Sequence, residues 1–305
     1  MYEMVNLKDN DVLGIGQTDS IFFSEDEYKA IRQEVIEAPE EGLNLLDAFP
    51  IREVAKSLKH YKYTTLDKYG DAGIIVSPGD FPALTLDGSE ASIRIPMKAI
   101  SYAIEKDDIV NSRLLGAPLD TTYARVAGER VKKLQDECLY TKSTVFGTQG
   151  IYGQGTGAFS GTNWTTATTD IYDQVRLWIQ EIPIAYRNGN STNMRMFLEG
   201  TQYSELFKRT WENSTGSTEG LSGNGTWWDI ITKAYPNLVI QETQWATTAT
   251  GVLYPFSANV AERVMGIPVQ NVELKQDVFI VKAAAIGRDV LAVYAPTAVV
   301  KASGI

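Results

Sequence analysis

Residues 63–96 read YTTLDKYGDAGIIVSPGDFPALTLDGSEASIRIP. The segment begins and ends like β-strand, and about two dozen residues rich in glycine and proline separate the two ends. A connection of this length is uncommon inside a compact domain and usually has a function. We therefore expect a two-stranded ribbon with a long loop at its tip, and a partner that the loop reaches.

The residues that flank the loop alternate in character, as strands do when one of their faces is covered. In the outgoing strand, one face is expected to carry Tyr61, Tyr63 and Thr65 and the other His60, Lys62 and Thr64. In the returning strand, the two faces are expected to carry Ile93, Ile95, Met97 and Ala99 and, opposite them, Arg94, Pro96 and Lys98. Pro96 favours an edge strand because proline cannot donate a hydrogen bond to a ladder.

The segment after the ribbon predicts a long helix over residues 121–142, with Asp120 as its N-cap. Its apolar stripe at helical spacing is expected to contain Tyr123, Val126 or Ala127, Arg130 or Val131, Leu134 and Cys138. Residues 147–161 hold six glycines and predict a flexible or tightly turning connection.

Helical and strand patterns alternate from residue 169 onward, which predicts an α/β or α+β unit with a sheet at its centre. Helices are expected near 171–184, 201–211 and 227–235, and strands near 194–200, 237–241 and 252–256. The tail from residue 277 predicts strand–turn–strand with Gly287 at the turn. Near the N-terminus, residues 24–38 predict a helix capped by Ser24.

Composition narrows the function classes. The chain has 305 residues and 44% hydrophobic residues, enough for a sizeable core. A single cysteine, Cys138, excludes an internal disulfide and a cysteine-rich zinc site. Residues 1–55 contain 13 acidic and 4 basic side chains, so they carry −9 of the net charge of −10. Nucleic-acid affinity comes chiefly from clustered lysine and arginine, so tight binding of DNA is not expected.

The sequence offers little catalytic chemistry. The one histidine, His60, lies in the predicted ribbon, and no nucleophile motif or metal-ligand spacing accompanies it. Six tryptophans and 38 acidic residues leave a two-carboxylate glycoside hydrolase as the enzyme alternative, with Glu212 or Glu242 as the candidate acids. We expect no enzyme, no cofactor and no metal site.

Three segments carry a resemblance to a known family: SIRIPMKAISYAIEKDDIVNSRLLG (92–116), LDTTYARVAGERVKKLQDECLYTKS (119–143) and the Gly-x-x-Gly-Ile-Tyr-Gly exit at 147–153. In their order along the chain they resemble the major capsid protein of tailed bacteriophages, whose shell fold is shared with encapsulins. The resemblance implies an α+β fold with an N-terminal arm, an extended β-hairpin loop, a peripheral domain with a long spine helix, and an axial α/β domain.

The resemblance also implies domain boundaries and a function. The arm and its helix would be residues 1–57, the extended loop 58–104, the peripheral domain 105–149 with return strands in 266–305, and the axial domain 150–265. The protein would assemble with itself, through pentamers and hexamers, into an icosahedral shell around double-stranded phage DNA. Portal, scaffolding or decoration proteins would be further partners, and no membrane would be involved. Its location would be the virion capsid, assembled in the host cytoplasm.

The ribbon is then expected to contact a neighbouring subunit, because an isolated two-stranded ribbon is marginally stable and its edges invite pairing. The expected contact residues are Tyr63, Lys68, Ile74, Val76, Phe81 and Leu84. Some members of the family crosslink a lysine of this loop. Lys62 and Lys68 lie in the corresponding region, but no matching asparagine or glutamate is found, so no crosslink is predicted.

Two alternatives to the phage shell remain. One is the wall of an encapsulin-type nanocompartment, which shares the fold; the expected loops at 213–225 and 245–251 favour the viral shell. The other is the glycoside hydrolase.

Overall fold

The computed structural model describes residues 42–69, 85–114, 119–141, 147–166, 169–187, 193–208, 210–211, 225–276 and 279–305. Residues 42–106 and 120–305 belong to one compact unit. A second unit contains residues 1–41 and 107–119, of which the structure describes most of helix α3 (Lys106–Leu114). The helix predicted from Ser24 lies outside the described residues.

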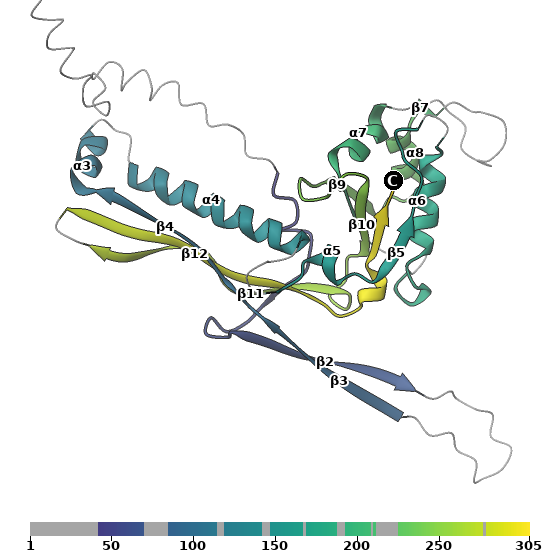
Figure 1. The fold of residues 1–305 in the computed structure, drawn as a ribbon, viewed down its shortest axis with the longest axis horizontal. Helices are drawn as coiled ribbons and strands as arrows, with labels where there is room; N and C mark the ends of the chain where they lie inside the picture. Colours follow the sequence, from purple (N-terminus) through teal and green to yellow (C-terminus); the bar gives the residue numbers. More distant parts are fainter. Residues whose placement is uncertain are drawn as a thin grey trace, which may run out of the picture. The chain divides into compact units, whose positions relative to one another are not determined.

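A four-stranded sheet and one long helix form the first layer pair (Figure 1). The strand order is β1 (Ile51–Glu53), β11 (Ala261–Gln276), β12 (Ile280–Val293) and β4 (Met97–Glu105), with β1 parallel to β11 and the other pairs antiparallel. Helix α4 (Leu119–Tyr140) lies along this sheet, where Ala127 and Val131 pack with Ala285 of β12. The helix was predicted, whereas β11 was missed.

The buried face of α4 differs from the predicted stripe by a rotation of the helix. Ala127, Val131 and Leu139 are at most 5% exposed, whereas Tyr123, Val126 and Leu134 are 45%, 39% and 41% exposed. The covered face also contains Gln135 and Asp136, which a purely apolar stripe cannot include. These two polar residues are buried because each forms hydrogen bonds to other elements. The helix already includes Leu119, so the prediction of Asp120 as its N-cap is wrong.

The predicted ribbon is present as β2 (His60–Tyr69) and β3 (Thr85–Arg94), paired from His60↔Arg94 to Tyr69↔Thr85. Residues 70–84, the predicted tip, lie outside the described residues. The alternation predicted for the outgoing strand is confirmed where side chains are described: Tyr61 is buried, and His60 and Lys62 are exposed.

The returning strand departs from the prediction at Pro96. Ile95 and Pro96 lie between β3 and β4 and are buried, so the chain leaves the ribbon there and enters the four-stranded sheet. The faces reverse at this break: Met97 and Ala99 are exposed, and Lys98 is 5% exposed. The prediction of one continuous strand was wrong because proline ends the ladder. Pro96 lies in neither strand, so the edge-strand position expected for it is not found, although β4, which follows it, is an edge strand.

A five-stranded sheet with helices packed on it forms the second part of the fold. Its order is β5 (Gly157–Ser160), β13 (Val300–Ser303), β10 (Thr250–Pro255), β6 (Met194–Leu198) and β9 (Leu238–Glu242). Helices α6 (Ile171–Gln180), α7 (Gly200–Lys208) and α8 (Trp227–Ala234) pack on it through a core that includes Trp178, Leu206 and Ile231. Short elements complete the unit: α5 (Ile151–Gln154), η1 (Ile184–Tyr186), β7 (Thr210–Trp211), β8 (Gly225–Thr226) and η3 (Pro296–Ala298). The predicted alternation of helices and strands is confirmed.

Two glycine interpretations need correction. Gly287 lies inside β12 and pairs with Lys98, so the predicted turn is wrong. A Cβ at Gly287 would lie 2.6 Å from Nε2 of Gln135, so the residue is small because α4 approaches it closely. The chain turns only after β12 ends at Val293. Strand β13 then pairs with β5 and β10 in the five-stranded sheet. From the resemblance, all of residues 266–305 were instead expected to belong to the return strands of the peripheral domain.

The glycine-rich segment 147–161 is a packed crossing. It contains α5 and β5, and a Cβ at Gly155 would lie 2.7 Å from Cγ1 of Val299. At Gly161 a Cβ would lie 2.5 Å from Cγ2 of Ile305. Of the two predicted possibilities, a tightly turning connection is the correct one.

The rotation of α4 gives the first prediction. Val131→Asp places a carboxylate at a 2% exposed position, where the described residues clustered around it carry no basic group to neutralise it. The substitution is expected to lower the free energy of unfolding by at least about 3 kcal/mol. Leu134→Asp, the matched control on the 41% exposed side of the same helix, is expected to change it by less than about 1 kcal/mol. Urea unfolding of the purified subunits followed by circular dichroism measures both. Equal losses in the two variants would contradict the orientation of the helix.

Candidate inter-subunit surface at the ribbon root

The ribbon is joined to the rest of its unit only at one end in the described chain. Strands β2 and β3 pair with each other over ten residues each, and no other described strand pairs with either of them. Both outer edges therefore present backbone N–H and C=O groups that no described strand uses. Such edges are templates for pairing with another chain.

Three tyrosines hold the root of the ribbon against the four-stranded sheet. Tyr61 and Tyr63 of β2 stack with ring centroids 6.0 Å apart, and Tyr63 meets Tyr294 edge to face at 4.8 Å. They belong to a cluster with Val264 and Val290 of the sheet. Edge-to-face aromatic pairs stabilise beyond the area they bury, so this contact fixes the direction in which the ribbon leaves the sheet.

A closed ring of hydrogen bonds covers these aromatic side chains. Arg52 Nη1 donates to the hydroxyl of Tyr61 at 3.0 Å, and the Tyr61 and Tyr294 hydroxyls are 3.1 Å apart. The Tyr294 hydroxyl donates to Oε2 of Glu262 at 2.8 Å, and the same oxygen lies 3.0 Å from Nε of Arg52. Burial, together with the Tyr61 and Glu262 contacts, raises the pKa of Tyr294, so its hydroxyl stays protonated as a donor. The hydrogen bond that Arg52 donates to Tyr61 is the main cause that raises the pKa of Arg52.

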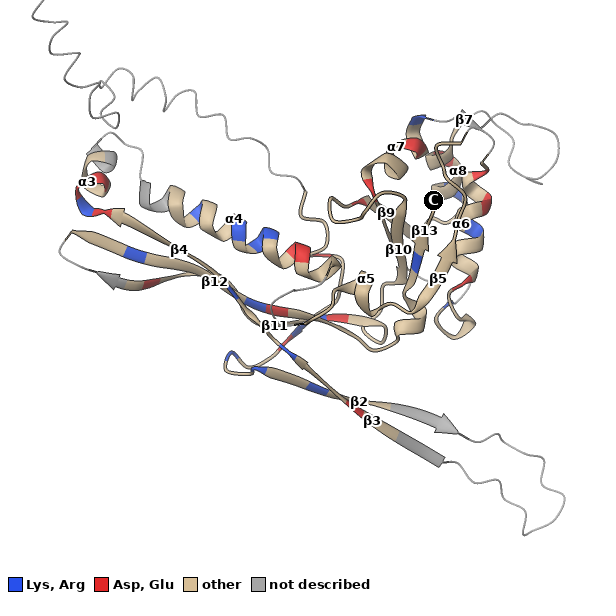
Figure 2. Cartoon of the chain, in the orientation of Figure 1, with Lys and Arg blue, Asp and Glu red and all other residues tan. Residues whose placement is uncertain are grey.

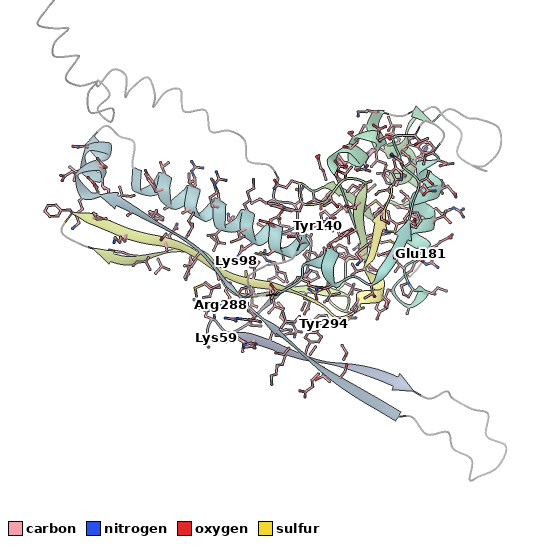
Figure 3. All side chains as sticks on the ribbon, viewed as in Figure 1. Lys59, Lys98, Tyr140, Glu181, Arg288 and Tyr294 are labelled. Carbon is pink, nitrogen blue, oxygen red and sulfur yellow. The ribbon has the colours of Figure 1, made fainter. Side chains whose placement is uncertain are left out.

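Backbone contacts tie the turn before β2 to the sheet. Arg288 Nη1 donates to the carbonyl oxygens of Lys56 and Leu58 at 3.1 and 3.4 Å. The N–H of Ile95 donates to the carbonyl of Lys59 at 2.9 Å. Figure 3 labels Arg288 of β12, Lys59, which directly precedes β2, and Tyr294, which directly follows β12. The root of the ribbon is therefore anchored by hydrogen bonds as well as by packing.

A buried ionic cluster lies directly behind the ribbon root. Asp289 is fully buried; its Oδ1 lies 2.5 Å from Lys98 Nζ and its Oδ2 lies 2.9 Å from Arg263 Nε. Arg263 also donates to the carbonyl of Leu46 at 3.0 Å and to Oε1 of Gln135 at 3.2 Å. One carboxylate thus links β4, β11 and β12, and its arginine partner extends the link to α4 and to the chain before β1.

A second buried carboxylate, Asp136 of α4, fixes two loops. Its Oδ1 accepts the backbone N–H groups of Leu45 and Leu46 at 2.8 and 3.1 Å. Its Oδ2 accepts the indole N–H of Trp245 at 2.8 Å. Burial raises the pKa of Asp136, and the hydrogen bonds from Trp245, Leu45 and Leu46 oppose that rise.

The predicted contact residues fall into three groups. Tyr63 lies at the ribbon root, half-buried, and its described contacts are within its own chain. Lys68 lies in β2, but only its backbone is described. Ile74, Val76, Phe81 and Leu84 lie outside the described residues. Their contact with a neighbouring subunit remains a prediction.

Sequence reasoning missed the partners that hold the root. Arg52, Glu262 and Tyr294 are far apart in sequence, and Tyr294 is 233 residues from Tyr61. A local pattern cannot join residues at such separations. The alternation of Tyr61 and Tyr63 was the available signal, because it showed that one face of the ribbon is covered.

The enzyme candidates are not brought together. His60 and Glu242 are exposed on separate strands, β2 and β9, and Glu212 lies outside the described residues. Within the described part of the chain, no three histidine, cysteine or acidic residues gather as a metal site would require. Likewise, no described helix is long and apolar enough to span a membrane.

Comparison with known proteins identifies the family. The family model described as "Major capsid protein" matches residues 70–253, more than half of the chain. This chain belongs to the major capsid protein family. The match includes β3, α4 and, in the five-stranded sheet, β5, β6 and β9. No curated protein matches the sequence significantly.

Solved structures confirm the fold of this capsid protein. "The capsid of Myoviridae Phage XM1" superposes with a TM-score of 0.72 at 15% identity, over 93% of this chain and 99% of that one. A chain of "Mycobacterium phage Bobi" gives a TM-score of 0.65 at 10% identity, over 89% of this chain and 93% of that one. The "virus-like particle from Pyrococcus furiosus" gives 0.56 at 12% identity, over 85% and 92%. The predicted family and its α+β shell fold are confirmed, and the capsid interpretation is favoured over the hydrolase.

The ionic cluster gives the second prediction. Asp289→Asn leaves Lys98 and Arg263 buried beside an uncharged amide, and removal of one partner from a buried ion pair is expected to cost about 3–5 kcal/mol. The matched control is Asp173→Asn, which removes an exposed ion pair with Arg176 and should lower the unfolding free energy far less. Thermal and urea unfolding of both variants measures the difference. A cost for Asp289→Asn as small as that for Asp173→Asn would show that the cluster does not hold the sheet together.

Proposed function

We propose that this major capsid protein assembles with copies of itself, through rings of five and six, into an icosahedral shell that encloses the double-stranded DNA of a tailed phage. The observation that carries the proposal is the ribbon: its root is fixed by the tyrosine ring and by Arg288, whereas no described strand pairs with its edges. A rigid root with open edges suits an element that binds another subunit. Family membership supports a structural role for that contact.

The contact would be made by the outer part of the ribbon. An isolated two-stranded ribbon is marginal in water, so a surface that covers it stabilises both partners. Residues Tyr63, Lys68, Ile74, Val76, Phe81 and Leu84 are proposed to lie at or near this contact. Because Tyr63 also packs on Tyr294 of its own chain, it would connect the contact to the subunit core.

The described sheets support a proposed division of the chain. The ribbon of β2 and β3 would be the extended loop, which is shorter than the predicted 58–104 because β4 would join α4, β11 and β12 in the peripheral domain. The five-stranded sheet with α6, α7 and α8 would form the axial domain around the symmetry axes of the shell. Strand β13 would then belong to the axial domain, although it follows the peripheral strands in sequence.

The remaining roles follow from this proposal. The protein would reside in the virion capsid after assembly in the host cytoplasm, and portal, scaffolding or decoration proteins would be additional partners. The enclosed DNA would be held by confinement, because a chain with a net charge of −10 repels phosphate. Figure 2, which colours the ribbon by charge, shows both basic and acidic residues on α4 and on the sheets.

Removal of the ribbon tip tests the proposal. Replacing residues 70–84 by a short Gly/Ser turn joins Tyr69 to Thr85, which are already paired, and changes loop-closure entropy little. The melting temperature of the isolated subunit is expected to stay close to that of the unaltered protein, while shells are absent or malformed in micrographs and sedimentation. Every copy of a repeated interface is lost at once, so the effect on assembly is large.

The outcomes of this deletion are distinct. Normal shells from the shortened protein would contradict a role of the tip in assembly. Loss of the subunit's own folding transition would place the tip in its core instead. Failure of the unaltered protein to form shells under any condition would contradict the proposed function as a whole.

A separate experiment tests the enclosure of DNA without tight binding. At about 0.15 M salt, purified subunits are expected to show no shift of duplex DNA in a gel, because affinity for duplex DNA requires clustered cations. A basic DNA-binding protein serves as the positive control. A salt-sensitive shift at micromolar subunit concentration would contradict the expectation.

A further inference from the structure

Strand β4 has one open edge in the described chain. It lies at the end of the four-stranded sheet, paired with β12 on one side, and no described strand pairs with its other side. Two of its apolar side chains, Met97 and Ile100, are 47% and 41% exposed. The exposed residues of the strand are Met97, Ala99, Ile100, Ser101, Ala103 and Glu105. A long, exposed and largely apolar edge strand is a template for pairing with another chain.

One hydrogen bond shows which backbone groups of β4 point to the open edge. The N–H of Lys106, directly after β4, donates to the carbonyl of Phe279, directly before β12, at 2.8 Å. The register of β4 on β12 is unbroken from Met97 to Glu105. Because the residues of an antiparallel strand bond alternately to its two sides, the even-numbered residues face β12. The odd-numbered residues direct their N–H and C=O groups to the open edge: Met97, Ala99, Ser101, Ala103 and Glu105.

The other edge strands of the two large sheets are short, and the ribbon strands are charged. Strands β1, β5 and β9 have three, four and five residues. The long ribbon strands carry charged residues along their length: Lys62, Asp67 and Lys68 in β2, and Asp87 and Glu90 in β3. Short length and charge are the usual means by which proteins keep an edge from pairing.

Strand β4 has neither protection. It is nine residues long. Of its two charged residues, Lys98 is buried against Asp289, and Glu105 is the last residue of the strand. The open edge of β4 is therefore free of charge over most of its length, as expected for an edge that another strand covers.

The sequence of β4 is complementary to itself. In an antiparallel pair of two copies with the two-fold axis at Ser101, all five outward-facing residues find partners: Ser101 faces Ser101, Ala99 faces Ala103, and Met97 faces Glu105. No like charges lie opposite each other, and the central side chains are small. On the side of α4, Ile100 of each copy faces Tyr102 of the other, and pairs of aromatic and β-branched residues stabilise a sheet. The pairing would also cover the exposed side chain of Ile100.

We propose that β4 pairs antiparallel with β4 of a second copy about a two-fold axis at Ser101, so that the four-stranded sheets of two subunits form one continuous sheet. The proposal rests on the proposed function, since a shell provides the second copy. A two-fold axis perpendicular to the sheet leaves α4 of both copies on the same face of the joined sheet. A shell wall requires this, because every copy must turn the same face inward.

Hydrogen exchange of the unaltered protein gives the first test. The amides of Ala99, Ser101 and Ala103 are expected to exchange at least about tenfold more slowly in assembled shells than in isolated subunits, because a hydrogen-bonded amide exchanges only when its bond opens. The amides of β12 are the control. They are already bonded within the subunit, on both sides of the strand, and should change little on assembly.

Disulfide trapping identifies the partner. Cys138, the chain's single cysteine, is first replaced by alanine, and Ser101→Cys is added. Opposed residues of a hydrogen-bonded pair have Cα atoms about 5.5 Å apart, within the roughly 4.4–6.8 Å that a disulfide spans. Oxidation of the shells with diamide is expected to give a product of about twice the 33.7 kDa chain mass.

Two further cysteine variants fix the register. Ala99→Cys alone and Ala103→Cys alone should give no such product, because each cysteine would be displaced from its copy by four residues, about 13 Å along the strand. Shells assembled from a mixture of these two variants should give the product, since Ala99 of one copy faces Ala103 of the other.

Proline variants separate pairing from folding. The N–H of Ser101 points to the open edge, so Ser101→Pro is expected to leave the melting temperature of the isolated subunit nearly unchanged while shells become absent or malformed. Ile100→Pro is the matched control. It removes an N–H that faces β12 and should lower the melting temperature of the subunit itself.

Each contrary result identifies a different error. Protected β4 amides in Ser101→Cys shells that form no disulfide would show a different occupant, and a product from Ala99→Cys alone would show a different register; both overturn the inference. If Ser101→Cys subunits do not assemble, the exchange of the unaltered protein decides. Normal shells of the unaltered protein with unprotected β4 amides would reject the inference and leave the proposed function intact, whereas absence of shells would reject both.

Discussion

The buried carboxylate of Asp289 is the interaction on which the rest of the structure depends. A charge in a protein interior is costly unless it is paired and hydrogen-bonded, and Asp289 is fully buried. It is neutralised only when Lys98 of β4 and Arg263 of β11 reach it together. Arg263 in turn requires Gln135 of α4 and the carbonyl of Leu46. Sheet, helix and the chain before β1 must therefore be in place at once, which makes this part of the fold cooperative.

The ribbon derives its direction from the same cluster. Lys98 lies four residues after Arg94, the last residue of β3, and Ile95 and Pro96 between them are buried. The tyrosine ring then fixes the other side of the root through Arg52 and Glu262 of β1 and β11. A subunit built in this way presents a rigid base from which a long, locally paired element extends. That arrangement suits a shell protein, because each copy must offer its contact in the same orientation to every neighbour.

The distribution of charge adds a second level of organisation. Residues 42–305 are nearly neutral, and their buried charged groups are paired or hydrogen-bonded in the Asp289 cluster, in the Arg52–Glu262 pair and at Asp136, while the N-terminal segment carries most of the net charge. Because the net charge is concentrated in the N-terminal segment, it affects the association of subunits more than the folding of the subunit core. The subunit core folds without a large self-repulsion, and the segment supplies a long-range electrostatic term that depends on salt and on the surface it meets.

The sequence by itself determined those features that rest on local periodicity or on the order of parts. The strand period at Tyr61 and Tyr63, the helical period of α4 and the alternation of helices and strands after residue 169 were all readable, and their order indicated the capsid family. Tertiary structure alone decided which face of α4 is buried, because Gln135 and Asp136 are acceptable inside only when Arg263, Leu45 and Trp245 meet them. It also decided that Gly287 lies within a strand, where α4 approaches closely, and that β11 is one long strand despite its register shifts. The ribbon root joins residues up to 233 positions apart, and no local pattern encodes a contact that only the folded chain brings within hydrogen-bond distance.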